Sequence, residues 1–284
     1  TGSSPHGQGT ETTMAQIAAD ELGIPYEDVE VQYNDTLGTP FGYGTYGSRS
    51  AAVGGAALFN AVQKVKQKAV RIGAHMLEAS PDDVVFEDGK VSVKGSPDQA
   101  KTIQEIAGAA ALGYSLPEGD EPFLDETAYF DPPNTTWPFG THICVVEVEK
   151  DTGSVMVKKY LAVDDVGNVV NPMIVDGQIH GGIAQGVAQA LWESGEYNES
   201  GQLVSGSMMD YAIPRTDCLP SFELDRTVTP SPTNPLGVKG VGETGTIAST
   251  PAVVNAVMDA LSPFGVTHLD MPLTSQKIWN AIQS

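Results

Sequence analysis

Apolar side chains recur at helical spacing in two long segments of the chain. Residues 11–22 repeat such side chains every three to four positions until Gly23, and residues 51–78 continue the period after a start rich in small residues. Further helix starts are indicated by a capping box at Thr102–Glu105, by a cap residue followed by proline at Asn171-Pro172 and Thr250-Pro251, and by the cap residue Thr274. We therefore expect helices along the whole chain.

Strand-like alternation of apolar and polar residues occupies the intervening segments. The predicted strands are Val29–Tyr33, Val84–Glu87, Lys90–Val93, Thr141–Val148, Val155–Val163, Ser207–Ala212 and Phe222–Thr227. A proline-rich, loop-like stretch lies between residues 113 and 138. Together these patterns predict an α+β fold, with mixed sheets carrying helices on their faces and two lobes, residues 1–130 and 131–284.

The composition narrows the class of protein. The 284 residues include 36 acids against 15 bases, a net charge of −21, which would repel the phosphates of a nucleic acid. Hydrophobic content of 40% indicates a soluble globular chain, and no apolar run reaches the roughly 20 residues that a membrane helix needs. The first residues resemble no secretory signal and include no initiator methionine, so we expect a fragment of a larger cytoplasmic protein.

Cysteine and histidine spacings give no metal motif. Cys144 and Cys218 stand far apart and outside any Cys-x-x-Cys pattern, which favours buried thiols in a reducing compartment. The five histidines lack the spacings of zinc sites, and His75 is expected to be a packing residue of its helix.

Two glycine-rich turns each lead into a predicted helix. Residues 6–10 read His-Gly-Gln-Gly-Thr, and residues 38–50 interleave glycines with hydroxyl groups and Arg49. A helix N-terminus presents unpaired N–H groups and a positive dipole end, so both turns suit a phosphate, and the second also suits a nucleobase edge. The alternative is that both loops only cap their helices.

A third glycine-rich stretch, Pro235–Pro251, contains a single carboxylate. Glu243 is surrounded in sequence by four glycines: Gly237, Gly240, Gly242 and Gly245. Glycine allows close approach of a backbone to a ligand, so this pattern favours a carboxylate directed at something bound, in a tight and partly dry loop. The alternative is an ordinary surface loop with a solvated glutamate.

An amide also interrupts the helix expected after Pro172. Gln178 and the pair Gly181-Gly182 break its apolar stripe near the start, which a purely structural helix rarely needs. Gln178 is therefore a candidate hydrogen-bonding partner of a ligand, unless backbone groups of the chain satisfy its amide.

These motifs together resemble a known family. They are His-Gly-Gln-Gly-Thr-Glu from His6, Gly-Thr-Tyr-Gly-Ser-Arg-Ser from Gly44, Asp-Asp-Val-Gly-Asn-Val-Val-Asn-Pro from Asp164 with Asp-Gly-Gln from Asp176, and Lys-Gly-Val-Gly-Glu from Lys239. In this order they resemble the molybdenum hydroxylases related to xanthine dehydrogenase, and are most similar to the large subunits of aerobic carbon monoxide dehydrogenases. The resemblance covers nearly the whole chain.

The resemblance implies a molybdopterin cofactor in its cytosine dinucleotide form, bound where the loops converge between the lobes. The implied cofactor-binding residues are Gly7, Gln8, Gly9, Thr45, Tyr46, Gly47, Ser48, Arg49, Ser50, Asp165, Asn168, Gln178, Lys239, Gly240 and Val241. Glu243 would lie beside molybdenum as the catalytic acid and base, in an oxidation that takes its oxygen from water.

The chain resembles only the carboxyl-terminal portion of these subunits. The segment that carries a copper-binding cysteine in the carbon monoxide branch is not in the sequence, so copper stays open, as do an aldehyde or N-heterocycle substrate and a non-catalytic scaffold. Iron–sulfur clusters and FAD would belong to partner subunits of a hetero-oligomer, because the sequence has no cluster motif. It also has no dinucleotide fingerprint of a nicotinamide enzyme.

Overall fold

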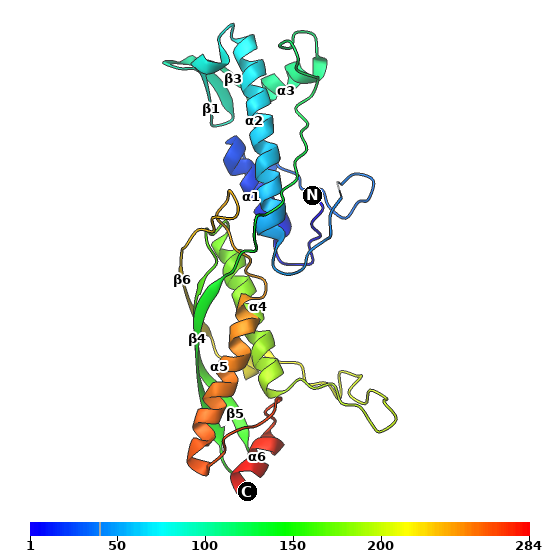
Figure 1. Ribbon diagram of the computed structural model, residues 1–284, viewed down its shortest axis with the longest axis vertical. Helices are drawn as coiled ribbons and strands as arrows, with labels where there is room; N and C mark the ends of the chain where they lie inside the picture. The colour runs from blue at the N-terminus through cyan, green and yellow to red at the C-terminus, as the bar shows by residue number, and fades with distance from the viewer. Residues whose placement is uncertain (40) are drawn as a thin grey trace. The chain divides into compact units, whose positions relative to one another are not determined.

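The computed structural model describes residues 1–39 and 41–284 (Figure 1). Pro40, within the predicted turn of residues 38–50, lies outside the described residues. The contacts divide the chain into two compact units. Unit 1 comprises Thr1–Thr136 and Ser231–Val238, and unit 2 comprises Trp137–Pro230 and Lys239–Ser284. Two lobes that share a cofactor, residues 1–130 and 131–284, stay a prediction.

Unit 1 packs helices beside a small antiparallel sheet. Its α-helices are α1 (Thr10–Leu22), α2 (Ala56–Met76), which continues a π-helical turn Ser50–Gly55, and α3 (Ile103–Leu112). Its strands are β1 (Val84–Glu87), β2 (Lys90–Val93) and β3 (Ser96–Thr102), in that order. Ala69, Ile72, Val91 and Ile106 are fully buried where α2 and α3 cover the sheet, so this core holds α3 and the second half of α2 against the sheet.

Unit 2 is built on a mixed sheet of three strands. β4 (Phe139–Glu149) pairs antiparallel with β5 (Ser154–Asp165), and β5 pairs parallel with β6 (Phe222–Thr227). The register sets Asp165 opposite both Phe139 and Thr227. Three side chains from separate segments thus meet at one end of the sheet.

Two long helices cover one face of this sheet (Figure 1). They are α4 (Pro172–Leu191) and α5 (Thr244–Leu261), and α6 (Ser275–Gln283) completes the unit. The core contains Tyr160, Ile183, Val253 and Leu261, each with 0% exposure. Burial of such side chains stabilises the unit by roughly 1.5–3 kcal/mol each, so the core holds α4 and α5 against the sheet.

The α+β class is confirmed, together with the hairpin at Asp88-Gly89, the capping box at Thr102, and the helix start at Asn171. The strand predicted at Val29–Tyr33 is wrong: its side chains alternate in burial, but among the described residues it joins no sheet. Ser207–Ala212 is likewise wrong, because turns occupy it. β3 was not predicted, since its sequence Ser-Pro-Asp-Gln-Ala-Lys-Thr has no apolar alternation.

Helix α5 begins earlier than predicted. α5 starts at Thr244 and passes through Pro251, whereas the sequence predicted a start at Thr250. The Thr250 hydroxyl donates to the carbonyls of Thr246 and Gly186, both 3.4 Å away. Proline within a helix removes one backbone hydrogen bond, and tertiary packing against α4 overrides that cost here.

The structure also describes the two cysteines, His75 and the length of the helices. Cys144 and Cys218 are free thiols, as predicted, but both are half-buried and not fully buried. His75 is exposed on α2 and contacts the Ser115 hydroxyl at 3.2 Å, so its packing role is wrong. No helix in residues 1–39 or 41–284 is both long and apolar enough to cross a membrane.

Candidate functional site

The first glycine-rich turn places an amide donor without a partner in front of α1. Gly7 and Gly9 take φ values of 103° and 78°, in the left-handed region that glycine adopts readily. The Gln8 side-chain oxygen accepts from the His6 N–H at 2.6 Å, whereas its Nε2 is buried and has no hydrogen-bond partner among the described residues. Buried polar atoms are normally satisfied, so this atom is suited to a ligand.

The second turn closes on itself through its own side chains. The hydroxyl groups of Thr45 and Ser50 lie 3.0 Å apart, and the Arg49 guanidinium stacks 4.9 Å from the ring centre of Tyr46. Gly47 has φ 58°, and a side chain added there would meet nothing within 4 Å. The turn therefore holds a cation and several hydroxyl groups at the start of the helical segment from Ser50.

A pocket of about 470 Å³ lies beside this turn within unit 1. It is lined by the start of the chain, the second turn, the first half of α2 and a later loop: Thr1–Ser3, Phe41–Gly44, Arg49, Ser50, Val53, Gly54, Ala57, Leu58, Ala61 and Glu126–Phe130. Pockets of roughly 300–1,000 Å³ bind small organic ligands. The lining combines aromatic rings with the cation of Arg49 and the carboxylate of Glu126, so a base could stack on the rings and Arg49 is the candidate phosphate contact.

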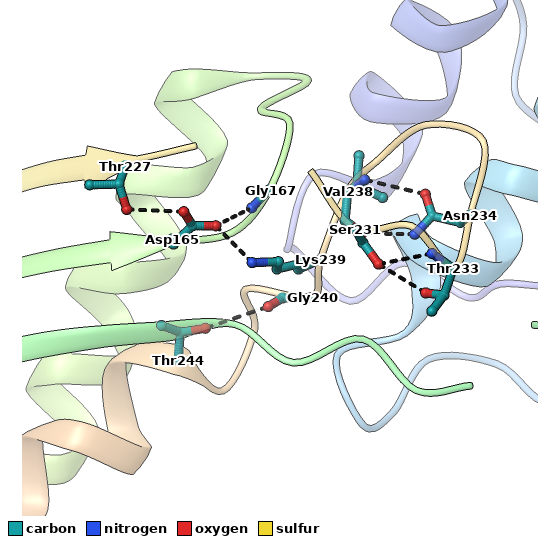
Figure 2. A network of polar contacts seen from close by, with 10 residues as sticks. All are labelled: Asp165, Gly167, Thr227, Ser231, Thr233, Asn234, Val238, Lys239, Gly240 and Thr244. Atoms are coloured by element: carbon teal, nitrogen blue, oxygen red, sulfur yellow. Dashed lines mark hydrogen bonds and ion pairs between the residues drawn. The ribbon is translucent and has the colours of Figure 1, made fainter. Parts of the chain in front are cut away.

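In unit 2, Asp165 ends β5 with its carboxylate fully engaged (Figure 2). It accepts from the Lys239 ammonium at 2.8 Å, the Gly167 N–H at 3.1 Å and the Thr227 hydroxyl at 3.0 Å. Burial alone would raise the pKa of Asp165, but Lys239, Gly167 and the hydroxyls of Thr229 and Thr227 hold that pKa below its ordinary value. The residue is 0% exposed, so it is an ionised, buried carboxylate.

Lys239 reaches this carboxylate from the start of the glycine-rich stretch. Its ammonium also lies 4.5 Å from the ring centre of Phe139, and its backbone N–H donates to the Val166 carbonyl at 2.8 Å. Both donor groups of Lys239 are therefore used within unit 2. Gly240 is buried, and the Val241 carbonyl accepts from the Thr244 N–H at 3.2 Å.

Glu243 occupies the N-cap position of α5 and is exposed. The expectation of a partly dry loop around it is wrong for the described chain: burial begins one residue later, at Thr244 and Gly245, where the helix meets α4. Its carbonyl accepts from the Ile247 N–H at 3.1 Å. The carboxylate thus stands at the helix start, beyond the packed interface.

Gln178 lies half-buried on α4, and Asn168 is exposed between β5 and α4. The pair Gly181-Gly182 that drew attention to Gln178 has a packing role at its second member. A Cβ on Gly182 would stand 2.8 Å from the Gly245 Cα, so glycine there lets α4 and α5 approach closely. Gly181 has open space around it.

Sequence reasoning missed Arg226 on β6. Its Nη2 forms an ion pair with Asp176 at 3.2 Å, two positions before Gln178, while its Nη1 is buried without a hydrogen-bond partner among the described residues. Position 226 has one visible signal, a base in a strand of a strongly acidic chain. Phe139 and Thr227 were also missed, because only the strand register brings them to Asp165.

Buried side-chain atoms that lack a hydrogen-bond partner indicate which kind of ligand the residues fit. Within residues 1–39 and 41–284, the buried side-chain atoms without a partner are Gln8 Nε2 and Arg226 Nη1, and both are donors. No group of three or more His, Cys, Asp or Glu in that part of the chain could hold a metal ion by itself. The two unsatisfied donors therefore fit an acceptor-rich ligand. Convergence of the turns of both units on one ligand stays a prediction.

Comparison with known proteins also indicates a cofactor of this kind. Residues 1–220 match the family described as a molybdopterin cofactor-binding domain. The chain is 45% identical over 282 residues to the carbon monoxide dehydrogenase large chain of Hydrogenophaga pseudoflava, covering 99% of this chain and 35% of that protein. It is 41% identical to the nicotine 6-hydroxylase large subunit of Paenarthrobacter nicotinovorans, covering 99% of this chain and 34% of that protein.

A solved structure agrees. The crystal structure of the Cu,Mo-CO dehydrogenase in its carbon monoxide reduced state superposes with a TM-score of 0.94 at 41% identity, covering 99% of this chain and 35% of that one. The chain thus spans about a third of the length of the relatives it matches.

Proposed function

The chain belongs to the molybdenum hydroxylase family through its molybdopterin cofactor-binding domain, and on this premise we propose that it forms the cofactor-binding, Glu243-bearing part of an oxidoreductase. The observation that carries the proposal is the pair of buried donors without partners, Gln8 Nε2 and Arg226 Nη1. Donors of this kind are costly unless an acceptor-rich ligand satisfies them. A molybdopterin carrying phosphates is such a ligand.

In the proposed enzyme, each glycine-rich loop contacts the cofactor or takes part in the reaction. The cofactor, when bound, supplies the two-electron oxidation. Gln8 donates from the first turn, Arg49 provides the cation of the second, and the stretch from Lys239 to Val241 offers backbone to the pterin. Glu243 takes up the proton released when water supplies the product oxygen, a general-base role that its exposed place at the start of α5 leaves open to substrate.

We assign the cytosine dinucleotide form to the pocket in unit 1. Its volume of about 470 Å³, its aromatic lining and Arg49 support a nucleotide end, and hydroxyls at Thr45 and Ser50 lie at the same turn. Guanidinium groups bind phosphate oxygens in a bidentate manner, so Arg49 would contact the diphosphate. The choice of cytosine follows from the family resemblance.

For the substrate, we propose carbon monoxide, with water as the oxygen source. The 45% identity to a carbon monoxide dehydrogenase large chain supports it. The 41% identity to a nicotine 6-hydroxylase large subunit supports an N-heterocycle as the second candidate. Iron–sulfur and flavin subunits and a cytoplasmic location complete the proposal, whereas copper stays open because the segment that would carry its ligand is not in the sequence. Both cysteines are free thiols, which agrees with a reducing compartment.

The test is metal and nucleotide analysis of the native complex that carries this chain. Molybdenum together with cytosine monophosphate released on heating would support the cofactor assignment, and equimolar copper would support carbon monoxide as substrate. Molybdenum without copper would favour an aldehyde or N-heterocycle. Absence of both metals would overturn the proposal and favour a scaffold that keeps the fold.

A further inference from the structure

We propose that the buried Asp165–Lys239 ion pair is a positioning pair, which fixes the segment from Lys239 to Glu243 and thereby the place of the Glu243 carboxylate (Figure 2). This inference rests on the proposed function, since there the place of Glu243 decides turnover. It gives Asp165 a different task from the cofactor contact predicted from the sequence.

The pair differs from the other ion pairs of the chain in its burial. The Lys239 and Asp165 side chains are 8% and 0% exposed, and no other Lys or Arg ion pair of the described residues has both side chains below a tenth. Desolvation makes a buried pair costly, and replacing it by apolar residues is often neutral or stabilising. Its burial is therefore weak evidence for a role in stability alone.

The Asp165 carboxylate is held mainly by groups of this chain. A carboxylate offers about four acceptor sites. Here three of them receive hydrogen bonds, from Lys239, Gly167 and Thr227. Donors from three separate segments hold it rigidly at the end of β5, so it serves as a fixed point for whatever binds to it.

Lys239 is tied to this fixed point twice. Its ammonium binds Asp165 at 2.8 Å, and its backbone N–H binds the Val166 carbonyl at 2.8 Å. The next ties come from Thr244 at the start of α5: its hydroxyl donates to the Gly240 carbonyl at 3.5 Å, and its N–H donates to the Val241 carbonyl at 3.2 Å (Figure 2). On the other side of Lys239, the Asn234 side chain holds the backbone of Val238 at 2.9 and 3.2 Å. Gly240 and Gly242 have no side chains to restrain the backbone, so Lys239 is the residue that ties this segment to the Asp165 end of the sheet.

The test compares variants of the assembled enzyme. In Lys239→Met we expect kcat to fall about tenfold or more with KM and molybdenum content within about twofold, because small misplacement of a catalytic group is costly. Lys239→Arg, which keeps the charge, should recover part of the loss. The matched control is Lys159→Met, which removes an exposed partner of Glu223 on the same sheet and should leave kcat unchanged.

A second measurement does not depend on the cofactor. Amide hydrogen exchange of residues 239–245 should become faster in Lys239→Met in both the loaded and the cofactor-free enzyme, with α6 unchanged. If the wild-type complex contains no molybdenum, the proposed function fails while this measurement still decides whether the pair orders the segment.

The double variant Asp165→Asn/Lys239→Met covers the case in which Lys239→Met fails to assemble, because it leaves no unpaired buried charge. We expect it to assemble with molybdenum, with kcat still lowered and exchange still faster. Wild-type kcat in either assembled variant would overturn the proposal. So would unchanged exchange, or a loss of kcat only in proportion to lost molybdenum, which would indicate cofactor retention instead.

Discussion

Gly182 of α4 and Gly245 of α5 lie against each other, and a Cβ on either would meet backbone atoms within 3 Å. A Cβ on Gly245 would stand 2.6 Å from the carbonyl oxygen of Ile179. Gln178 directly precedes Ile179, and Glu243 stands two positions before Gly245. The contact therefore sets the spacing between a predicted cofactor ligand and the predicted catalytic carboxylate, although neither side chain takes part in it.

Gly182→Ala should destabilise the enzyme. The added methyl group would press on the Gly245 Cα and the Thr246 nitrogen, each 2.8 Å away, and backbone cannot yield as a side chain can. Overpacking of this kind costs about 1–3 kcal/mol, which thermal unfolding would report as a lowered Tm. Gly181→Ala is the matched control, because nothing lies within 4 Å of its added methyl group. It should be neutral or stabilising by about 0.5–1 kcal/mol; equal loss in both variants would contradict the explanation.

Glu243→Gln should abolish turnover while molybdenum content stays normal. The amide keeps the shape of the side chain at the start of α5 but cannot accept a proton at neutral pH. General-base catalysis contributes roughly 10²–10⁴-fold, so kcat should fall by at least about two orders of magnitude in steady-state assays. Glu223→Gln, at an exposed position of β6, is the control. Activity retained in Glu243→Gln would show that another group accepts the proton.

Arg49→Met should weaken retention of the dinucleotide. Loss of a charge-assisted hydrogen bond costs roughly 1.5–3 kcal/mol, which is tenfold or more in affinity. Nucleotide released per enzyme, measured after dialysis, should therefore drop below that of the wild type. Arg215→Met removes a guanidinium that is 77% exposed and should have no effect. Equal nucleotide content in both variants would remove Arg49 from the binding site.

Acid should destabilise the wild type through Asp165. Its pKa in the folded chain lies below the ordinary value of 3.8, so the unfolded state binds the proton first as pH falls. The stabilisation from its ionised form is complete above pH 4 or so and is lost progressively below that pH. The Tm difference between the wild type and Asp165→Asn/Lys239→Met should thus be constant from about pH 5 to 7 and change as pH falls toward 3. A difference independent of pH would contradict this assignment.

Local chemistry along the chain was sufficient for much of the fold. Asn171-Pro172, the Thr102 capping box and the Asp88-Gly89 turn each act within a few residues, so the sequence predicts them directly. The same holds for the glycine turn of residues 6–10, whose positive φ values only glycine adopts readily. The motifs that mark the family are likewise short and ordered along the chain.

Only tertiary structure decided the partners of these local elements. Val29–Tyr33 has a strand pattern, yet a strand needs a neighbour, and the described residues provide none. α5 runs through Pro251 because its packing on α4 outweighs one lost hydrogen bond. Asp165 and Lys239 lie 74 positions apart, and sequence alone could not show that their charges meet in a buried site. Contacts between distant segments depend on the packed fold, whereas turns and caps depend on neighbouring residues.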